Sequence, residues 1–175
     1  METLWLRPLT LEDLDTIYAW SQDDEFCLSN GWSLGLSHQK IKVWWMALLK
    51  TPSTVMVRQG IMHGGQLVGF VELSHINPVL QTASFGIAIG ARDLWGQGLG
   101  TQAGRLMIQH GFQEMNLRQI RAEVHRPNVR SLALMKKLGF RKTGILKEHE
   151  VYRGQLSDVV LFALDRPDPD CCVDQ

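Results

Sequence analysis

Three glycines stand at alternate positions in residues 95–101, which read WGQGLGT. They lie between an apolar stretch that ends at Ile89 and an amphipathic stretch that begins near Gly98, so the chain passes here from a strand to a helix. Without side chains, Gly96, Gly98 and Gly100 let the backbone approach a ligand closely and point several N–H groups at it. Because these donors add to the positive end of the helix dipole, the turn predicts an anion-binding site.

The same glycines also fit a crowded turn without any ligand, because a glycine-rich motif alone is weak evidence. Two familiar nucleotide-binding motifs do not match. The turn lacks the Gly-Lys-Ser/Thr ending of a P-loop, and its spacing departs from the dinucleotide-binding fingerprint. If a ligand binds here, it is another phosphate-bearing molecule, held by main-chain amides that each contribute roughly 1.5–3 kcal/mol.

The alternation of apolar and polar residues predicts the elements that position this turn. Strands are expected over residues 3–9, 54–59, 66–74, 82–89, 120–124, 141–147 and 151–164. Helices are expected over 11–20, after a cap at Ser37 as far as 49, over 98–112 and over 128–138, with a loop over 21–36. This order predicts a mixed α/β layer with antiparallel strands rather than a regular βαβ array.

Composition and charge limit the possible classes of protein and partner. The 175 residues are 45% hydrophobic and 21% charged, so we expect one globular domain over 1–165 and a polar tail over 166–175. Lys plus Arg and Asp plus Glu both number 18. A formal net charge of zero does not favour nucleic acid or an anionic membrane as the partner.

The cysteines and the N-terminus bear on the compartment. Cys27 stands alone, and Cys171 and Cys172 are adjacent in the tail, which matches neither a disulfide framework nor the spacing of metal ligands. The N-terminal residues have no basic start followed by an apolar run, so we expect no secretory signal, and no apolar stretch approaches the ~18 residues that span a bilayer. We therefore expect a soluble cytoplasmic protein without a bound metal.

Five segments of the chain are informative together: LRPLTLEDLD, GQLVGFVEL, WGQGLGTQA, NVRSLALMKKLGFRKTGILKE and YRGQLSD. With these segments the chain resembles the GNAT superfamily of acetyl-coenzyme A-dependent N-acetyltransferases. The segments lie in family order across about 160 residues, which is far more specific than one motif. The resemblance is greatest to the branch of ribosomal-protein N-terminal and spermidine acetyltransferases. It implies a mixed, mostly antiparallel twisted sheet of six or seven strands with four helices, splayed between strands 4 and 5.

The resemblance also implies which residues contact acetyl-CoA, the expected co-substrate. Amides over 96–101 are expected to bind the pyrophosphate, and residues 87–89 to pair with the pantetheine arm, because in the family a bulge splays the fourth strand from the fifth. Asn128 is expected near the thioester, although it also fits a helix N-cap. The expected residues are Ile87, Ala88, Ile89, Trp95, Gly96, Gln97, Gly98, Leu99, Gly100, Thr101 and Asn128. Trp95 stands where the family usually has Arg or Gln, a departure common in this branch.

Acetyl transfer to an amine needs a base, an oxyanion donor and a proton for the leaving thiolate. Glu72 is the first candidate for the base and His75 the second, while a solvated surface Glu is the competing interpretation, since Glu72 lies on the opposite face from Val71 and Leu73. A main-chain N–H near Ala88 or Ile89 is the expected oxyanion donor. Many family members protonate the thiolate with a Tyr, but Met135 occupies that position here. Ser131 resembles the serine used in the ribosomal-protein branch, although it also fits an ordinary helix surface.

The acceptor site is expected at a rim formed by Trp32, Tyr152, Glu72 and His75, whereas Trp44 and Trp45 are expected to pack inside. Asp23, Asp24 and Glu25 are candidates to attract a cationic amine, or they form an exposed charged loop without a ligand. The expected acceptor is a small-molecule amine or a protein N-terminus, and the expected assembly is a monomer or a homodimer. Two alternatives stay open: a catalytically weak acyl-CoA-binding or sensing module, and a structural domain that uses the glycines only for folding.

Overall fold

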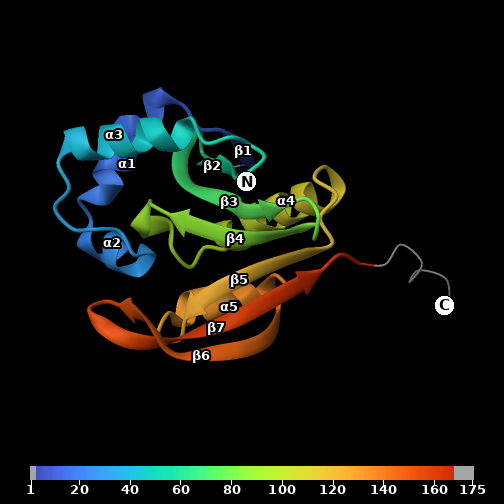
Figure 1. The fold of residues 1–175 in the computed structure, drawn as a ribbon. Helices are drawn as coiled ribbons and strands as arrows, with labels where there is room; N and C mark the ends of the chain where they lie inside the picture. Colours follow the sequence, from blue (N-terminus) through green and yellow to red (C-terminus); the bar gives the residue numbers. More distant parts are fainter. Residues whose placement is uncertain (1–2, 168–175) are drawn as a thin grey trace.

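The computed structural model describes residues 3–167, and its seven strands form one mixed sheet (Figure 1). The strands are β1 (Leu4–Pro8), β2 (Val57–His63), β3 (Gln66–Asn77), β4 (Thr82–Ile89), β5 (Gln119–His125), β6 (Arg141–Tyr152) and β7 (Gln155–Asp165). Their order in the sheet is β1-β2-β3-β4-β5-β7-β6. The pair β4–β5 is parallel and the other five pairs are antiparallel, which confirms the expected mixed fold.

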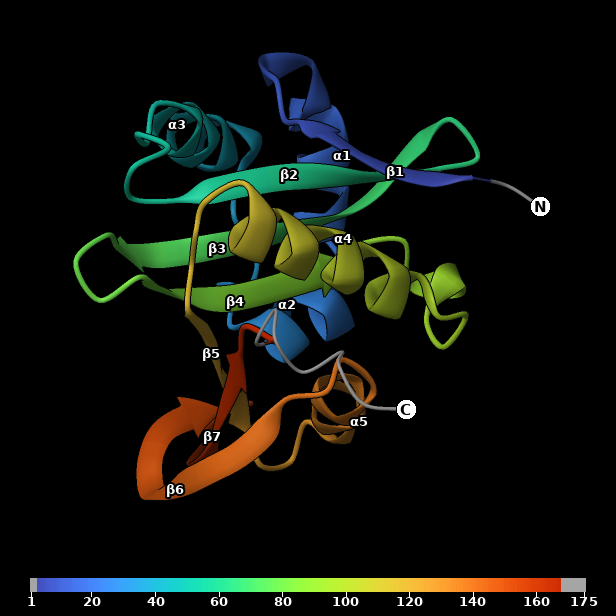
Figure 2. The same ribbon diagram turned by 90° about the vertical axis from the view of Figure 1, so that its right-hand side faces the viewer.

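Helices cover both faces of the sheet (Figure 2). They are α1 (Leu14–Ser21), α2 (Asp24–Asn30), α3 (His38–Leu49), α4 (Leu99–Gln113) and α5 (Val129–Lys137), with short 3-10 helices at Leu11–Asp13 and Arg92–Leu94. Helices α4 and α5 lie on one face, and α1, α2 and α3 lie on the other. In the part of the chain that the structure describes, no helix is both long and apolar enough to cross a membrane.

Side-chain alternation in β3 divides the core into two layers. Val71 and Leu73 pack with Met107 of α4 on one face, while Phe70 packs with Ile17 and Phe26 of the α1–α3 layer on the other. Each large apolar side chain that is fully buried stabilises the fold by roughly 1.5–3 kcal/mol. The sheet is therefore held from both sides.

Strands β4 and β5 pair over three residues only. The register Thr82↔Gln119, Ala83↔Ile120 and Ser84↔Arg121 ends there, although β4 continues to Ile89 beside β3 and β5 continues to His125 beside β7. The two strands thus open into a V, and α2 lies at its wide end (Figure 1).

The V confirms the expected splay, but the expected bulge does not accompany it. The β3–β4 register runs without a shift from Ser74 to Gly69, opposite Ser84 to Ile89. The irregularity lies at the other end of β4, between Ser74 and Asn77, where His75 has a φ of 49°.

Several predicted bounds are wrong for local reasons. The expected loop over 21–36 contains α2, because the Asp23 carboxylate accepts hydrogen bonds from the amides of Glu25 and Phe26, and Gly31 ends the helix at a φ of 68°. Strand β2 begins at Val57, three residues later than expected; β6 continues to Tyr152, beyond the expected end at 147, and β7 begins at Gln155 instead of 151. Trp45 is fully buried as expected, whereas Trp44 is 38% exposed. Residues 168–175 of the predicted tail, with Cys171 and Cys172, lie outside the described residues.

Candidate active site

A cleft of about 270 Å³ follows the opened edge of β4. The glycine turn and the first turn of α4 form one end, and α5 forms the facing wall. Every predicted cofactor residue except Gln97 lines this cleft. Ser29 and Asn30 of α2 also line it, so a segment predicted as a loop contributes a wall. The side chain of Gln97 instead donates to the carbonyl of Asp93 at 3.1 Å.

The glycine turn leaves space where side chains would otherwise stand. Gly96 and Gly98 have φ angles of 81° and 84°, and no atom lies within 4 Å of the position that a Cβ would occupy on either residue. Gly98 is the N-cap of α4, whose first amides have no acceptor within the helix. The turn can therefore present backbone donors to an anion in the cleft.

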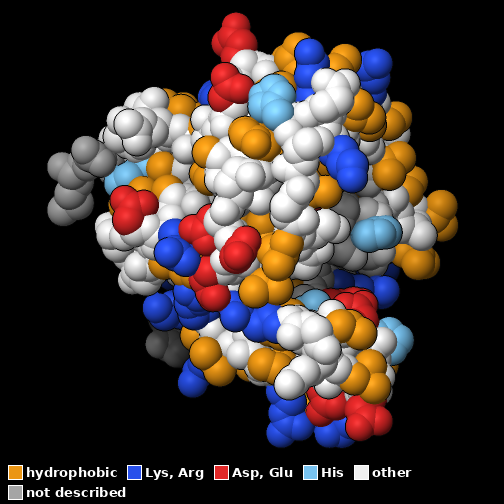
Figure 3. Space-filling view, turned by 90° about the vertical axis from the view of Figure 1, so that its left-hand side faces the viewer, with side chains coloured by type: hydrophobic (Ala, Val, Ile, Leu, Met, Phe, Trp, Pro, Cys, Tyr) orange, Lys and Arg blue, Asp and Glu red, His pale blue; other side chains and the backbone are white. Residues whose placement is uncertain are grey.

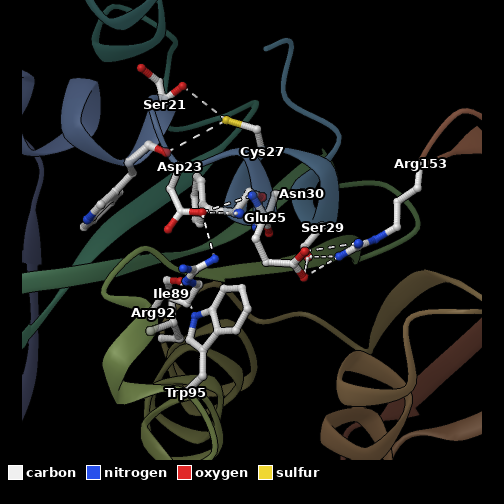
Figure 4. Close-up of polar contacts among 12 residues, drawn as sticks. Ser21, Asp23, Glu25, Cys27, Ser29, Asn30, Ile89, Arg92, Trp95 and Arg153 are labelled. Atoms are coloured by element: carbon white, nitrogen blue, oxygen red, sulfur yellow. Dashed lines mark hydrogen bonds and ion pairs between the residues drawn. The ribbon is translucent and has the colours of Figure 1, made fainter. Parts of the chain in front are cut away.

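Trp95 links the turn to both walls of the cleft. Its indole Nε1 donates to the carbonyl of Ile89 at 2.7 Å (Figure 4). The guanidinium of Arg130 on α5 lies 3.7 Å from the centre of the Trp95 ring, which is a cation–π contact. Arg130 and Lys137 line the cleft and bring positive charge to it. Sequence reasoning missed both residues, although both lie on the helix that follows Asn128.

Asn128 caps a helix and also faces the cleft. Its Oδ1 accepts a hydrogen bond from the amide of Ser131 at 3.2 Å, so it is the N-cap of α5, and it lines the cleft as well. Ser131 also lines the cleft. Met135, where the family resemblance implied a Tyr in other members, is 3% exposed and belongs to the core.

Glu72 lies on the face that carries α1–α3, beside the cleft rather than in its lining. Its carboxylate accepts a hydrogen bond from Arg58 and lies next to Gly86 of β4. The guanidinium of Arg58 lies 4.8 Å from the centre of the Phe70 ring. The Glu72 side chain is 18% exposed, so it is a paired carboxylate rather than a solvated one.

The other predicted acceptor residues do not gather at one rim. Trp32 is half-buried and stacks on Phe70 with ring centres 6.3 Å apart, on the same face as Glu72. His75 is exposed near the start of β4, the opposite end from the cleft. Tyr152 is buried, and its ring stacks on His125.

Two of the three acidic residues near α2 are already paired with arginine (Figure 4). Asp23 lies 3.3 Å from Arg92, and Glu25 contacts both Arg153 and Arg130. The hydrogen bond from Arg153 lowers the pKa of Glu25 below its usual range. Seen from the open side of the V, a cluster of acidic side chains lies next to a band of basic side chains (Figure 3). Asp23 and Glu25 are therefore held in ion pairs with arginines and do not form a free acidic patch.

Cys27 does not offer a nucleophile to the cleft. The residue is fully buried, and its thiol donates to the carbonyl of Ser21 at 3.3 Å. Burial, together with Asp24 and Asp23, raises the pKa of the thiol. A thiol in this state stays protonated and unreactive.

An open strand edge, a glycine turn that caps a helix and a facing helix with a polar N-terminus define an acetyltransferase domain. Residues 3–141 match the family described as Acetyltransferase (GNAT) domain, and the chain belongs to this family.

Curated and solved relatives agree with this assignment. Spermidine N(1)-acetyltransferase of Escherichia coli (strain K12) is 33% identical over 100 residues, which are 57% of this chain and 53% of that protein. The chain thus spans about half the length of the curated relatives that it matches first. Two solved structures share the fold, each with a TM-score of 0.82 over 93% of this chain. One is spermidine N-acetyltransferase from Vibrio cholerae with CoA and spermine, at 23% identity and 95% coverage of that chain. The other is RimL, a ribosomal L7/L12 alpha-N-protein acetyltransferase with coenzyme A, at 18% identity and 94% coverage.

Proposed function

We propose that this protein is an N-acetyltransferase that moves the acetyl group of acetyl-CoA onto a primary amine by direct attack in a ternary complex. One observation carries the proposal: a single cleft joins an unpaired strand edge, a set of helix-terminal amides and two cationic side chains. A ligand that uses all three features needs amide groups to pair with the strand edge and a diphosphate to bind the helix-terminal amides and the cations. Coenzyme A has both, because its pantetheine arm carries amide groups and is joined to a diphosphate.

The cofactor fits the cleft from the turn inward. Amides over 96–101 bind the diphosphate, except those of Gln97 and Thr101, which already donate to the carbonyls of Leu94 and Gly98. Arg130 and Lys137 supply the positive charge that Trp95 does not. The pantetheine amides pair with the edge of β4 like an added strand. Trp95 already occupies the carbonyl of Ile89, and the carbonyl of Ala88 faces Gly69 of β3. We therefore place this pairing on the backbone of Ile87.

The thioester then lies between β4 and the N-terminus of α5, where Asn128 and Ser131 line the cleft. A main-chain N–H near Ala88 or Ile89 stabilises the oxyanion that forms when the amine attacks the carbonyl. Ser131 is the proposed donor to the departing thiolate, since Met135 is buried in the core and carries no proton to give. Glu72 is the base that the sequence favours, acting through water.

We propose a primary amine as the acceptor, bound on the face that carries Trp32. Relatives include enzymes named for spermidine and for the N-terminus of a ribosomal protein, so both kinds of amine are candidates. Paired acids weaken the case for a polycation, because Glu72, Asp23 and Glu25 each contact an arginine.

Thermal unfolding with CoA and acetyl-CoA, followed by thiol detection with a panel of amines, tests the proposal. Spermidine, amino sugars and short peptides with free N-termini form the panel. We expect a higher unfolding temperature with either cofactor and release of free thiol with at least one amine. If CoA does not stabilise the protein, the proposal is wrong.

Met135 favours one second candidate, an acyl-CoA-binding or sensing module with little catalysis. This alternative predicts stabilisation by CoA without thiol release from any amine. Replacing Glu72 by Gln belongs to the same assay, since unchanged turnover at every pH removes Glu72 from the mechanism.

A further inference from the structure

A histidine–carboxylate pair lies outside the set of residues that the sequence singled out for the base. His125 ends β5, and its Nε2 lies 2.8 Å from a carboxylate oxygen of Glu150 on β6. The imidazole stacks on the buried ring of Tyr152, with centres 4.7 Å apart and planes 17° from parallel. Two neighbours therefore fix both the plane and the rotation of this ring.

The strand register places His125 across the V from the cleft. The last β4–β5 pair is Ser84↔Arg121, and four residues further on the two strands reach Ala88 and His125. Ala88 lines the cleft. The carbonyl of His125 accepts a hydrogen bond at 2.8 Å from the amide of Asn128, which also lines the cleft. His125 thus lies at the level where we place the thioester.

Side-chain alternation places the imidazole on the acceptor side. Ile120, Ala122 and Val124 of β5 are buried in the core beneath α4 and α5, so His125 points to the opposite face. Ala88 belongs to the core on that same opposite face, with α1–α3. On this side Ser29 and Asn30 of α2 close the cleft.

We propose that His125 is the catalytic base of the acetyl transfer, oriented by Glu150 and Tyr152; this inference rests on the proposed function. With its Nε2–H donated to Glu150, the imidazole keeps a lone pair on Nδ1 for a proton. Such a carboxylate-held histidine is a recurrent general base. Neither His125 nor Glu72 is among the residues that line the cleft, but the Glu72 carboxylate, unlike the imidazole, is held by the guanidinium of Arg58.

The step balances with one proton carried from nitrogen to sulfur. The neutral amine forms a C–N bond to the thioester carbonyl, and the proton on that nitrogen passes to Nδ1 of His125. The C–S bond then breaks; the hydroxyl of Ser131 gives its proton to the thiolate and takes the proton from Nδ1 in return. The products are the amide and free CoA thiol, and the imidazole is neutral again. This route needs no tyrosine at position 135.

The surroundings of His125 leave Glu150 as its direct charged partner. Glu123 lies two residues earlier on the same face of β5, and Asp158 of β7 is already bonded to Lys147, Arg126 and the amide of Glu148. Beyond Tyr152, the guanidinium of Arg153 is bound by Glu25. A fall of kcat/KM on the acid side is therefore expected to report an imidazole that takes up a proton.

His125→Gln tests the proposal, with His38→Gln as a matched control. His38 lies on α3, 3.3 Å from Asp15, and its ring meets the edge of Tyr18, so it has the same kinds of neighbour away from the cleft. The assay uses acetyl-CoA with the fastest amine of the panel. For His125→Gln we expect kcat/KM to fall roughly 10²–10⁴-fold with the acid limb lost, and CoA affinity by calorimetry to stay unchanged. Glu150→Gln is expected to give a smaller loss and a displaced acid limb.

A spectroscopic measurement gives a readout besides turnover. Addition of CoA to the wild-type protein is expected to shift the imidazole Cε1–H resonance of His125 and to leave that of His38 in place. The inference is overturned, while the proposed function stands, if His125→Gln turns over at the wild-type rate. It is also overturned if the chemical shift of the His125 resonance does not change when CoA binds. Failure of CoA to bind the wild-type protein overturns the proposed function itself.

Discussion

Gly98 and Gly65 allow the strain of a left-handed backbone to be separated from ligand contact. Their φ angles are 84° and 76°, and neither has an atom within 4 Å of its would-be Cβ. Alanine at either position costs roughly 1 kcal/mol of stability, because an L side chain strains this conformation. The Gly98→Ala methyl also enters the cleft, so we expect CoA affinity to fall at least about tenfold, or ~1.4 kcal/mol. Urea unfolding and calorimetry on both variants measure these effects; equal CoA affinity in the two would contradict a diphosphate at this turn.

Arg130 is a second residue whose role can be measured directly. It lines the cleft from α5, so Arg130→Gln removes one positive charge beside the proposed diphosphate. We expect the dissociation constant of CoA to rise about tenfold, and its dependence on salt to weaken, since a half-exposed ion pair is screened. Arg141→Gln is the control, because Arg141 pairs with Asp165 outside the cleft. If both variants lost CoA affinity equally, the effect would come from the net charge of the protein and not from Arg130 in the cleft.

At the scale of elements, the opening of the V depends on how closely β3 holds β4. A Cβ on Gly69 would lie 2.4 Å from the carbonyl oxygen of Ala88 and 3.0 Å from the Cα of Ile89. Both contacts involve backbone, so the end of β4 must shift in Gly69→Ala.

We expect Gly69→Ala to lower the free energy of unfolding by about 1–3 kcal/mol and to weaken CoA binding. Gly144→Ala in β6 is the matched change, because its nearest contact is Leu161 at an ordinary 3.6 Å. Denaturant titration measures the free energy of unfolding of both variants. Equal values would show that the close contact between Gly69 of β3 and the end of β4 does not limit stability.

Element boundaries show where local patterns suffice. The helix over 98–112 and the strand over 82–89 were predicted closely, because periodicity and the glycine turn are local signals. Helix α2 was missed within 21–36, although Asp23 and Gly31 supply an N-cap and a C-cap. Its seven residues are too short for a clear periodic pattern.

At the scale of the molecule, α2 joins the two halves that the V separates. Glu25 on α2 contacts Arg153 at the β6–β7 turn, 128 residues along the chain. Because the hydrogen bond from Arg153 lowers the pKa of Glu25, the pair is complete above the usual range of a glutamate and is lost as the pH falls below it. The ion pair is exposed, so its contribution to global stability is small.

We therefore expect a local effect from Glu25→Gln at neutral pH. Amide hydrogen exchange should become faster in Asp24–Asn30 and at the β6–β7 turn, with the unfolding midpoint nearly unchanged. The wild-type protein should show the same pattern only when the pH falls below the usual titration range of a glutamate, because the pKa of Glu25 is lowered. Asp165→Asn, which breaks an exposed pair with Arg141, is the control. Unchanged exchange in α2 would show that Glu25 does not hold this helix.

The sequence by itself determined the glycine turn, the strand that leads into it, the N-cap at Asn128 and the likeness to one family. These features depend on residues adjacent in the chain, whose backbone preferences and periodicity are readable in order. Only the tertiary structure decided that Arg130 stacks on Trp95, that Glu72 is bound by Arg58, that Tyr152 is buried and that His125 meets Glu150 across from Ala88. Such contacts join residues that are up to 128 positions apart, and their partners are set by strand register and by the V between β4 and β5, which no local pattern encodes.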